Sequence, residues 1–152
     1  MDRVLFAGFR GKNNASGSLA EQLSPEPLLL TNSFAGLRAD IESVRREYDY
    51  AILFGVDKTL VSSARIEKSA VRDGERTVSV LNTEKISEAL RTAGIPAAVS
   101  DDPGPCLCNE AYWHALEKFS GRAVFIHMPT VRHADERFMK KMKSAVLTLS
   151  EL

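Results

Sequence analysis

The sequence predicts an α/β fold: a three-layer α/β/α sandwich with a mostly parallel, twisted central sheet. Short apolar runs alternate with amphipathic stretches along the chain. Several of these runs are apolar on both faces, as expected of strands that are covered by helices on both sides. The length of 152 residues suits one domain, so we expect residues 1–152 to form a single α/β domain.

The strands are predicted from the apolar runs. The first run, residues 4–8, is apolar on both faces and belongs near the centre of the sheet. Further strands are expected at residues 28–31, 50–56, 64–71, 77–81, 95–99 and 123–126. Residues 72–75 form a turn between two of them. Pro96 favours the edge of the sheet, or the start of a strand, for the segment that contains it.

The helices are predicted from apolar residues at helical spacing and from capping residues. They are expected at residues 18–23, from residue 34 through Tyr48, and at about 83–93, 106–119 and 135–149. Asn82 or Thr83 can cap the third helix, and Gly94 lies at its C-terminal end. Residues 10–17 are predicted to be a polar loop, and residues 101–105 a tight connection.

The charge balance and the apolar pattern exclude several classes of protein. Twenty Lys and Arg residues balance twenty Asp and Glu residues, so nothing attracts the whole chain to nucleic acid or to an anionic membrane. No apolar run approaches the ~20 residues of a membrane helix. A strand-like segment begins at once, which argues against a signal peptide. Cys106 and Cys108 are too close in sequence for a structural disulfide, and we therefore expect a cytoplasmic protein.

Cys108 is the first candidate for catalysis, because it lies in the first turn of a predicted helix. The backbone N–H groups and the helix dipole favour a thiolate there, so we expect a lowered pKa for this thiol. The same backbone N–H groups near Cys108 can hold an oxyanion. The alternative is a small, buried hydrophobic residue. We expect Cys106 to point elsewhere on the helix and to pack, with a resolving thiol as the alternative.

His127 and Glu67 are the candidate partners of Cys108. His127 ends an apolar strand, and ligands collect at the carboxyl ends of strands in open α/β sheets. Cys108 also follows a strand, so we expect both at one edge of a parallel sheet, where a neutral His activates a thiol. Glu67 can fix the imidazole tautomer. The alternatives are a structural histidine and a surface carboxylate paired with Lys68 or Arg65. No Cys/His cluster has metal-ligand spacing, so we expect no metal site.

Five separated segments carry a family resemblance. They are Val-Leu-Phe-Ala-Gly-Phe (4–9), Arg-Ile-Glu-Lys-Ser-Ala-Val (65–71), Gly-Ile-Pro-Ala-Ala-Val-Ser (94–100), Gly-Pro-Cys-Leu-Cys-Asn (104–109) and Phe-Ile-His-Met-Pro (125–129). In these segments the chain resembles the pyrrolidone-carboxylate peptidases (pyroglutamyl peptidase type I), as a shortened and divergent member. The resemblance implies that Glu67, Cys108 and His127 form a catalytic triad, in the family's chain order.

The resemblance also implies an activity. It is that of a cysteine peptidase that removes an N-terminal pyroglutamyl residue from peptides and needs no metal or organic cofactor. Family members often assemble as dimers or tetramers, which implies a homo-oligomer with a small peptide or amide as substrate. Two alternatives stay open. One is a cysteine amidohydrolase with a different small-amide specificity, and the other is a catalytically silent binding or assembly paralogue.

The chain departs from the family at two places near the implied site. Phe9 matches an aromatic residue of the family's opening segment and is the expected substrate-binding residue. The next residues, 10–12, are Arg-Gly-Lys, where the family has a segment with a second pocket aromatic. The family's arginine near the nucleophile has no clear equivalent, and Lys58 or Arg65 are the candidates to replace its charge.

Overall fold

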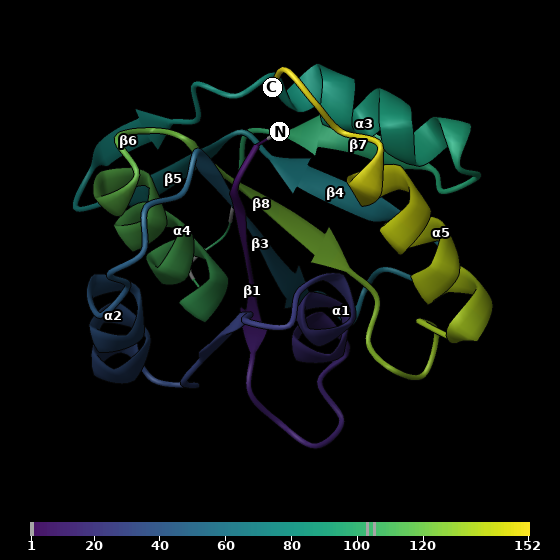
Figure 1. The fold of residues 1–152 in the computed structure, drawn as a ribbon, viewed down its shortest axis with the longest axis horizontal. Helices are drawn as coiled ribbons and strands as arrows, with labels where there is room; N and C mark the ends of the chain where they lie inside the picture. Colours follow the sequence, from purple (N-terminus) through teal and green to yellow (C-terminus); the bar gives the residue numbers. More distant parts are fainter. Residues whose placement is uncertain (1, 103, 105) are drawn as a thin grey trace.

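A six-stranded sheet forms the middle layer of the computed structural model, which describes residues 2–102, 104 and 106–152 (Figure 1). Across the sheet, the order is β2 (Leu28–Leu30), β1 (Val4–Phe9), β3 (Tyr50–Val56), β8 (Ala123–Met128), β4 (Ala64–Glu67) and β7 (Ala97–Ser100). The long strands β1, β3 and β8 lie at the centre, because their side chains are apolar on both faces.

The sheet is mostly parallel, as predicted, but two of its strands run against the others. β1 is parallel to β2 and β3, and β3 is parallel to β8. β4 is antiparallel to β8 and parallel to β7. β7 lies at the edge of the sheet, which is the position that Pro96 predicts for it.

Helices cover both faces of the sheet and confirm the three-layer α/β/α prediction (Figure 1). One face carries α1 (Ala15–Leu23), α3 (Thr83–Thr92) and α5 (Glu136–Leu147). The other face carries α2 (Phe34–Glu42) and α4 (Leu107–Lys118). Each face has its own apolar cluster, because alternate strand residues point to opposite sides. In the described parts of the chain, no helix has the length and apolar character that crossing a bilayer requires.

Several predicted elements have different bounds in the structure, among them the strand expected at residues 77–81, which is β6 (Glu75–Val78). The loop expected at residues 10–17 is shorter, because the Asn14 side chain accepts a bond from the backbone N–H of Ser16 and starts α1 at Ala15. The helix expected to carry Tyr48 ends at Glu42 instead. Tyr48 lies after the helix and still packs against the cluster on the α2 and α4 face.

The run expected to be one strand at residues 64–71 is divided at Lys68. β4 ends at Glu67, and β5 (Ser69–Arg72) pairs with β6 (Glu75–Val78) as a separate hairpin. Asp73 and Gly74 turn this hairpin with φ values of 50° and 79°. The chain therefore leaves the main sheet directly after Glu67. Two residues of the expected connection at 101–105, Pro103 and Pro105, lie outside the described residues.

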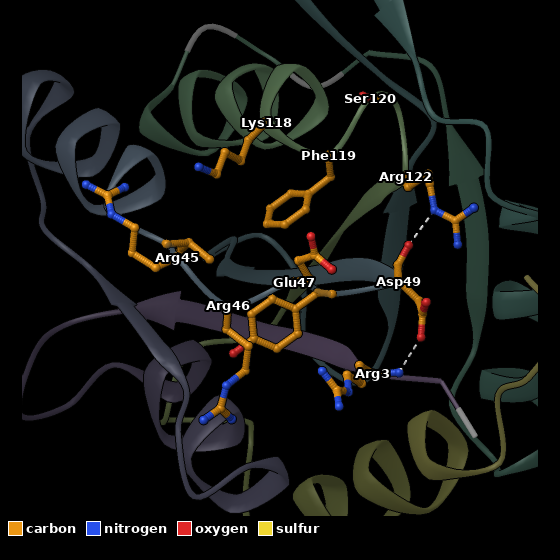
Figure 2. A pocket seen from close by; sticks show the side chains of 11 residues that line it. Arg3, Arg45, Arg46, Glu47, Asp49, Lys118, Phe119, Ser120 and Arg122 are labelled. Carbon is orange, nitrogen blue, oxygen red and sulfur yellow. Dashed lines mark hydrogen bonds between the residues drawn. The ribbon is translucent and has the colours of Figure 1, made fainter.

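A cavity of about 650 Å³ opens at the amino ends of β1, β3 and β8 (Figure 2). Its lining includes Arg3, Asp49 and Arg122, each of which lies just before one of these strands. The Asp49 carboxylate accepts a bond from the backbone N–H of Arg3 at 2.6 Å, and the Asp49 carbonyl accepts one from the Arg122 side chain. His127 lies near the carboxyl end of β8, so this cavity and His127 are at opposite ends of the central strands.

Candidate active site

The antiparallel pairing of β4 with β8 brings two of the predicted residues together. In this register Arg65 lies opposite His127, and Glu67 lies opposite Phe125. Phe125 belongs to the cluster under α4, whereas Ile66 belongs to the cluster on the other face. Because side chains alternate along a strand, Arg65, Glu67 and His127 share the face that α4 covers.

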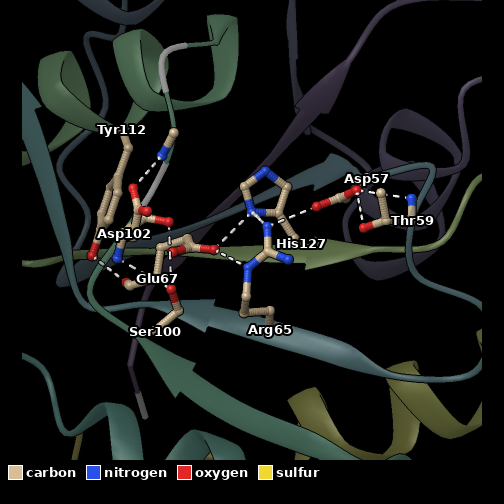
Figure 3. A network of polar contacts seen from close by, with 9 residues as sticks. Asp57, Thr59, Arg65, Glu67, Ser100, Asp102, Tyr112 and His127 are labelled. Carbon is tan, nitrogen blue, oxygen red and sulfur yellow. Dashed lines mark hydrogen bonds and ion pairs between the residues drawn. The ribbon is translucent and has the colours of Figure 1, made fainter.

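His127 and Glu67 form a buried pair on that face (Figure 3). The His127 Nδ1 lies 3.0 Å from Glu67 Oε1, and both side chains are almost fully buried. Glu67 Oε2 is also buried and has no hydrogen-bond partner among the described residues. The ring of Phe125 packs against the imidazole, with 4.8 Å between the ring centroids. This arrangement fixes the orientation of the imidazole, as predicted for Glu67.

The pKa of His127 is raised by its surroundings. Burial alone lowers this pKa, but hydrogen bonds with Cys106 and Glu67, together with the negative charge of Glu67, outweigh that effect. Because Nδ1 contacts Glu67, Nε2 is the ring nitrogen that is available to the cysteines.

Arg65 ties the buried pair to Asp57 (Figure 3). Its Nε donates to Glu67 Oε1 at 2.6 Å, its Nη2 donates to Asp57 Oδ2 at 2.8 Å, and Nη2 also lies 3.3 Å from His127 Nδ1. Burial raises the pKa of Asp57, but bonds from the Thr59 hydroxyl and backbone N–H and from Arg65 lower it to about 2. Of the two cations considered as replacements for the family's arginine, Arg65 is therefore the one at the site. Lys58 is exposed.

Cys106 and Cys108 both lie beside His127. The two sulfurs and a ring nitrogen of His127 are within 4.8 Å of one another. Cys108 is the second residue of α4, and its position next to His127 agrees with the prediction. The expectation that Cys106 packs elsewhere is wrong. Cys106 is the N-cap of α4 with an extended backbone (φ −115°, ψ 177°), so helical spacing does not govern where its side chain points.

The proton distribution in the cysteine pair also differs from the prediction. The thiol of Cys108, hydrogen-bonded to Cys106 and half-buried, has a raised pKa, where a lowered one was expected. The pKa of the exposed Cys106 falls to about 4. A hydrogen bond from Cys108 contributes most to this lowering, and bonds from His127 and from the backbone N–H groups of Asn109 and Cys108 add to it. Within the pair, these contacts favour a proton on Cys108 and ionisation of Cys106, the less buried sulfur.

The route that brings Cys108 to His127 is not the predicted one. β7, which precedes α4, runs antiparallel to β8. The carboxyl end of β7 therefore lies on the side of the sheet where β8 has its amino end. The start of α4 nonetheless lies beside the end of β8, because the sulfurs of Cys106 and Cys108 are close to His127. The Asn109 side chain then fixes α4 to the hairpin, since it accepts from the backbone N–H of Val71 at 2.9 Å and donates to the Val71 carbonyl at 2.7 Å.

Gly55 is a further residue of the candidate site, and it was not predicted from the sequence. It lies opposite His127 in the pairing of β3 with β8. A Cβ atom on Gly55 would be 2.7 Å from the Cys108 sulfur and 2.5 Å from Phe125 Cζ. A glycine inside an otherwise apolar strand is the signal that could have identified this close approach.

Phe9 lies at the end of β1 and is buried. It belongs to the apolar cluster that Cys108 also contacts. Its expected role in binding substrate stays a prediction.

Comparison with known proteins identifies relatives of the chain. The profile of the pyroglutamyl peptidase family matches residues 62–149, a range that contains Glu67, Cys108 and His127. The chain is similar to a pyrrolidone-carboxylate peptidase of Escherichia fergusonii, with 31% identity over 121 residues that cover 74% of this chain and 53% of that protein. A pyrrolidone-carboxylate peptidase of Cupriavidus taiwanensis is 27% identical over 168 residues, covering 96% and 74%. The chain thus spans about half the length of the first of these relatives.

Solved structures share the fold. The pyrrolidone carboxyl peptidase of Thermococcus litoralis superposes with a TM-score of 0.75 and 22% identity, covering 97% of this chain and 92% of that one. Pyroglutamyl peptidase I of Bacillus amyloliquefaciens superposes with a TM-score of 0.76 and 20% identity, covering 97% and 96%. The mostly parallel sheet between helices is therefore the fold of these structures.

Proposed function

This chain belongs to the pyroglutamyl peptidase family, and on that basis we propose that it is a cysteine peptidase that removes an N-terminal pyroglutamyl residue from peptides. The observation that carries the proposal is the buried contact of His127 Nδ1 with Glu67 Oε1 at 3.0 Å, with the Cys108 sulfur close to the same imidazole. A thiol beside an oriented imidazole is the arrangement that generates a nucleophile.

The proposed reaction proceeds by acyl transfer. Cys106 first takes the Nε2 proton of His127 and turns away, which leaves Nε2 free to accept the proton of Cys108. The Cys108 sulfur then attacks the carbonyl carbon of the pyroglutamyl residue. As the C–S bond forms and the C–N bond breaks, His127 returns the proton to the leaving amine. Water then hydrolyses the thioester, with His127 as the base. Glu67 holds the imidazole tautomer throughout, and the guanidinium of Arg65 holds Glu67.

The proposed oxyanion site is formed by backbone near Cys108. The backbone N–H groups of Cys108 and Asn109 donate to the sulfur of Cys106 and lower its pKa, so they favour an anion at this position. Donors that hold one anion are suited to hold the developing oxyanion of a tetrahedral intermediate. In this mechanism, the Cys106 side chain rotates away before the substrate carbonyl enters. Its exposed position at the helix N-cap leaves room for that rotation.

A cysteine amidohydrolase for another small amide is the second candidate function. The exposure of Arg10 and Lys12 favours it, since these polar residues directly follow the buried Phe9. A lactam pocket needs apolar walls and partners for the ring amide, and exposed cations supply neither.

The first experiment is release of a fluorophore from a pyroglutamyl-amide substrate. Turnover is expected in the wild-type protein and is expected to vanish in the Cys108→Ala and His127→Ala variants. His133→Ala is the matched control, because His133 lies five residues beyond the end of β8 and lines a separate surface pocket beside Ile95 and Lys141, outside the candidate site. Turnover that survives in Cys108→Ala contradicts the proposed nucleophile. Turnover only on other small amides supports the amidohydrolase, and none on any amide by a folded protein supports a silent paralogue.

We also propose that residues 1–152 act as a single domain that assembles into homo-oligomers. The exposed side chains of Val78 and Val80 offer apolar surface for contact between copies. Sedimentation at several protein concentrations tests the assembly, and a monomer at every concentration contradicts it. A single unfolding transition is expected of a single domain.

A further inference from the structure

The start of α4 and the end of β8 place three metal-binding side chains in one cluster. The sulfurs of Cys106 and Cys108 and a ring nitrogen of His127 lie within 4.8 Å of one another. In a tetrahedral zinc site, bonds of about 2.3 Å to sulfur and about 2.0 Å to nitrogen separate the donor atoms by roughly 3.5–3.8 Å. The donors therefore need to approach by about 1.3 Å at most, given their present separation.

The flexible member of the cluster can supply this movement. Cys106 is exposed and lies outside the helix, at its N-cap. Rotation of one side-chain torsion changes the position of its sulfur. Cys108 and His127 are held more firmly, by Gly55 and Phe125 on one side and by Glu67 on the other.

The chemistry of the donors selects the ion. Two thiolates and one imidazole suit zinc and other soft or borderline ions, and they disfavour magnesium and calcium, which prefer oxygen. Three protein ligands leave the fourth tetrahedral position for water or for another small ligand. The sequence alone does not indicate this cluster, because His127 is 19 residues beyond Cys108 and the two short segments meet only in the folded sheet.

The surroundings of His127 match those of a metal-bound histidine. Figure 3 shows Nδ1 of the ring directed at Glu67 and Arg65, and the second ring nitrogen on the side away from them. A carboxylate on Nδ1 fixes the tautomer that presents Nε2 to a metal ion. Glu67 is in turn held by Arg65 at 2.6 Å. The histidine ligand is thus oriented before any ion arrives.

The local charge also favours a cation. Arg65 is the cation beside His127, and it is paired with two carboxylates, Glu67 and Asp57. This group of three side chains carries one net negative charge. Two cysteine thiolates would add two more, and a divalent ion would compensate them. Binding therefore replaces the protons that remain on the two sulfurs and on Nε2 of His127 with one metal ion.

We propose that Cys106, Cys108 and His127 form a binding site for zinc or a similar thiophilic ion. The ion is not a cofactor of the proposed peptidase. It takes the sulfur of the nucleophile and the nitrogen of the base, so its binding blocks acyl transfer. This blocking effect rests on the proposed function, whereas the binding of the ion does not. Without Cys106, the ion would have two protein ligands, Cys108 and His127. With Cys106 it has three.

The test is a titration of the reduced, full-length protein with Co²⁺ in the absence of oxygen. The expected result is one ion per chain, with a thiolate-to-cobalt charge-transfer band and the visible bands of a tetrahedral site, both removed when Zn²⁺ displaces the cobalt. Cys106→Ser is expected to weaken Zn²⁺ binding at least about tenfold, since loss of even an outer partner of a ligand costs that much. Cys108→Ser and His127→Ala are expected to weaken it similarly, and His133→Ala is the matched control.

Two results overturn the proposal. One is the absence of a thiolate-to-cobalt band in folded wild-type protein, and the other is equal Zn²⁺ affinity in the wild type and in Cys106→Ser. These spectra need no substrate, so a protein without turnover still decides the question. The blocking effect has its own measurement, in which Zn²⁺ inhibits wild-type turnover at a concentration at least about tenfold lower than it inhibits Cys106→Ser. If the same Zn²⁺ concentration inhibits the wild type and Cys106→Ser, Cys106 has no role in the inhibition by Zn²⁺.

Discussion

Gly55 and Cys108 are in direct steric contact, and the absence of a side chain on Gly55 makes room for the Cys108 sulfur. A Cβ atom at position 55 would lie 2.7 Å from that sulfur, a distance that real Cβ atoms essentially never show. Gly55 also faces His127 across the pairing of β3 with β8. One backbone position therefore determines how closely the thiol approaches the imidazole.

Substitution of Gly55 by Ala is expected to displace the Cys108 sulfur and to remove peptidase turnover. Phe125 is also affected, because its Cζ lies 2.5 Å from the added atom. Overpacking of this kind costs about 1–3 kcal/mol of the free energy of unfolding. Denaturant unfolding and substrate turnover measure the two effects. Gly74→Asn is the control, since position 74 has open space and a φ of 79° that Asn tolerates. Normal turnover in Gly55→Ala contradicts the prediction.

Replacement of Cys106 by Ala is expected to raise kcat/KM by roughly tenfold. The Cys106 sulfur accepts the backbone N–H groups that we assign to the oxyanion, and a single such donor is worth about a hundredfold or more in rate. Removal of the sulfur leaves these donors to the substrate. Steady-state kinetics with the fluorogenic substrate measure the change. A fall to the level of Cys108→Ala would instead identify Cys106 as the nucleophile.

Replacement of Arg65 by Ala is expected to reduce both stability and turnover. It leaves Glu67 buried without its cation, and breaking such a pair costs about 3 kcal/mol of the free energy of unfolding. Turnover falls because Glu67 no longer has a fixed position beside His127. The neighbouring cation Lys68 is exposed, so Lys68→Ala is the matched control and is expected to change neither quantity. Equal unfolding curves for the two variants would refute this role of Arg65.

The lowered pKa of Asp57 predicts that the free energy of unfolding decreases at acidic pH. Its pKa is about 2 in the folded protein, below the value of about 3.9 in an unfolded chain, so the folded state favours the ionised form. Its contribution of about 2 kcal/mol is present above pH 4 and is lost as the pH falls towards 2. The measurement is the free energy of unfolding from pH 6 to pH 2, for the wild type and for Asp57→Asn.

In that experiment, the difference between the two proteins is expected to shrink as the pH falls. Asp73→Asn is the control, because Asp73 is exposed in the turn of the hairpin and Asn tolerates its φ of 50°. A difference between the wild type and Asp57→Asn that stays constant over the whole range would count against the prediction.

The central strands and the capped helices were predictable because local sequence determines them. β1, β3 and β8 are apolar on both faces, and Asn82 caps α3 as its residue type suggests. The direction of β4 was not predictable. An alternating pattern is the same for a parallel and an antiparallel strand, and only contact with β8 selects between them.

In the candidate site, too, some features were predictable from local sequence, and others depend on contacts between distant segments. Glu67, Cys108 and His127 were named from strand ends, a helix start and family motifs, and the structure brings the three together. Cys106 was misjudged because helical spacing does not apply to an N-cap residue. The interaction of Arg65 with His127 depends on the antiparallel register, which is a property of two distant segments and not of either sequence alone.

The position of β8 in the sheet has a consequence for the order of folding. β8 lies between β3 and β4, although it follows both of them in the sequence. Within the main sheet, the strands β2, β1 and β3 meet β4 and β7 only through β8. The two groups of strands can each form early, but they join only when the last strand inserts between them. Such non-local pairing is slow, because a long loop must close before its contacts form. Glu67 and His127 are 60 residues apart, so their contact is expected to form in this late step, and the candidate site is complete only when the sheet is complete.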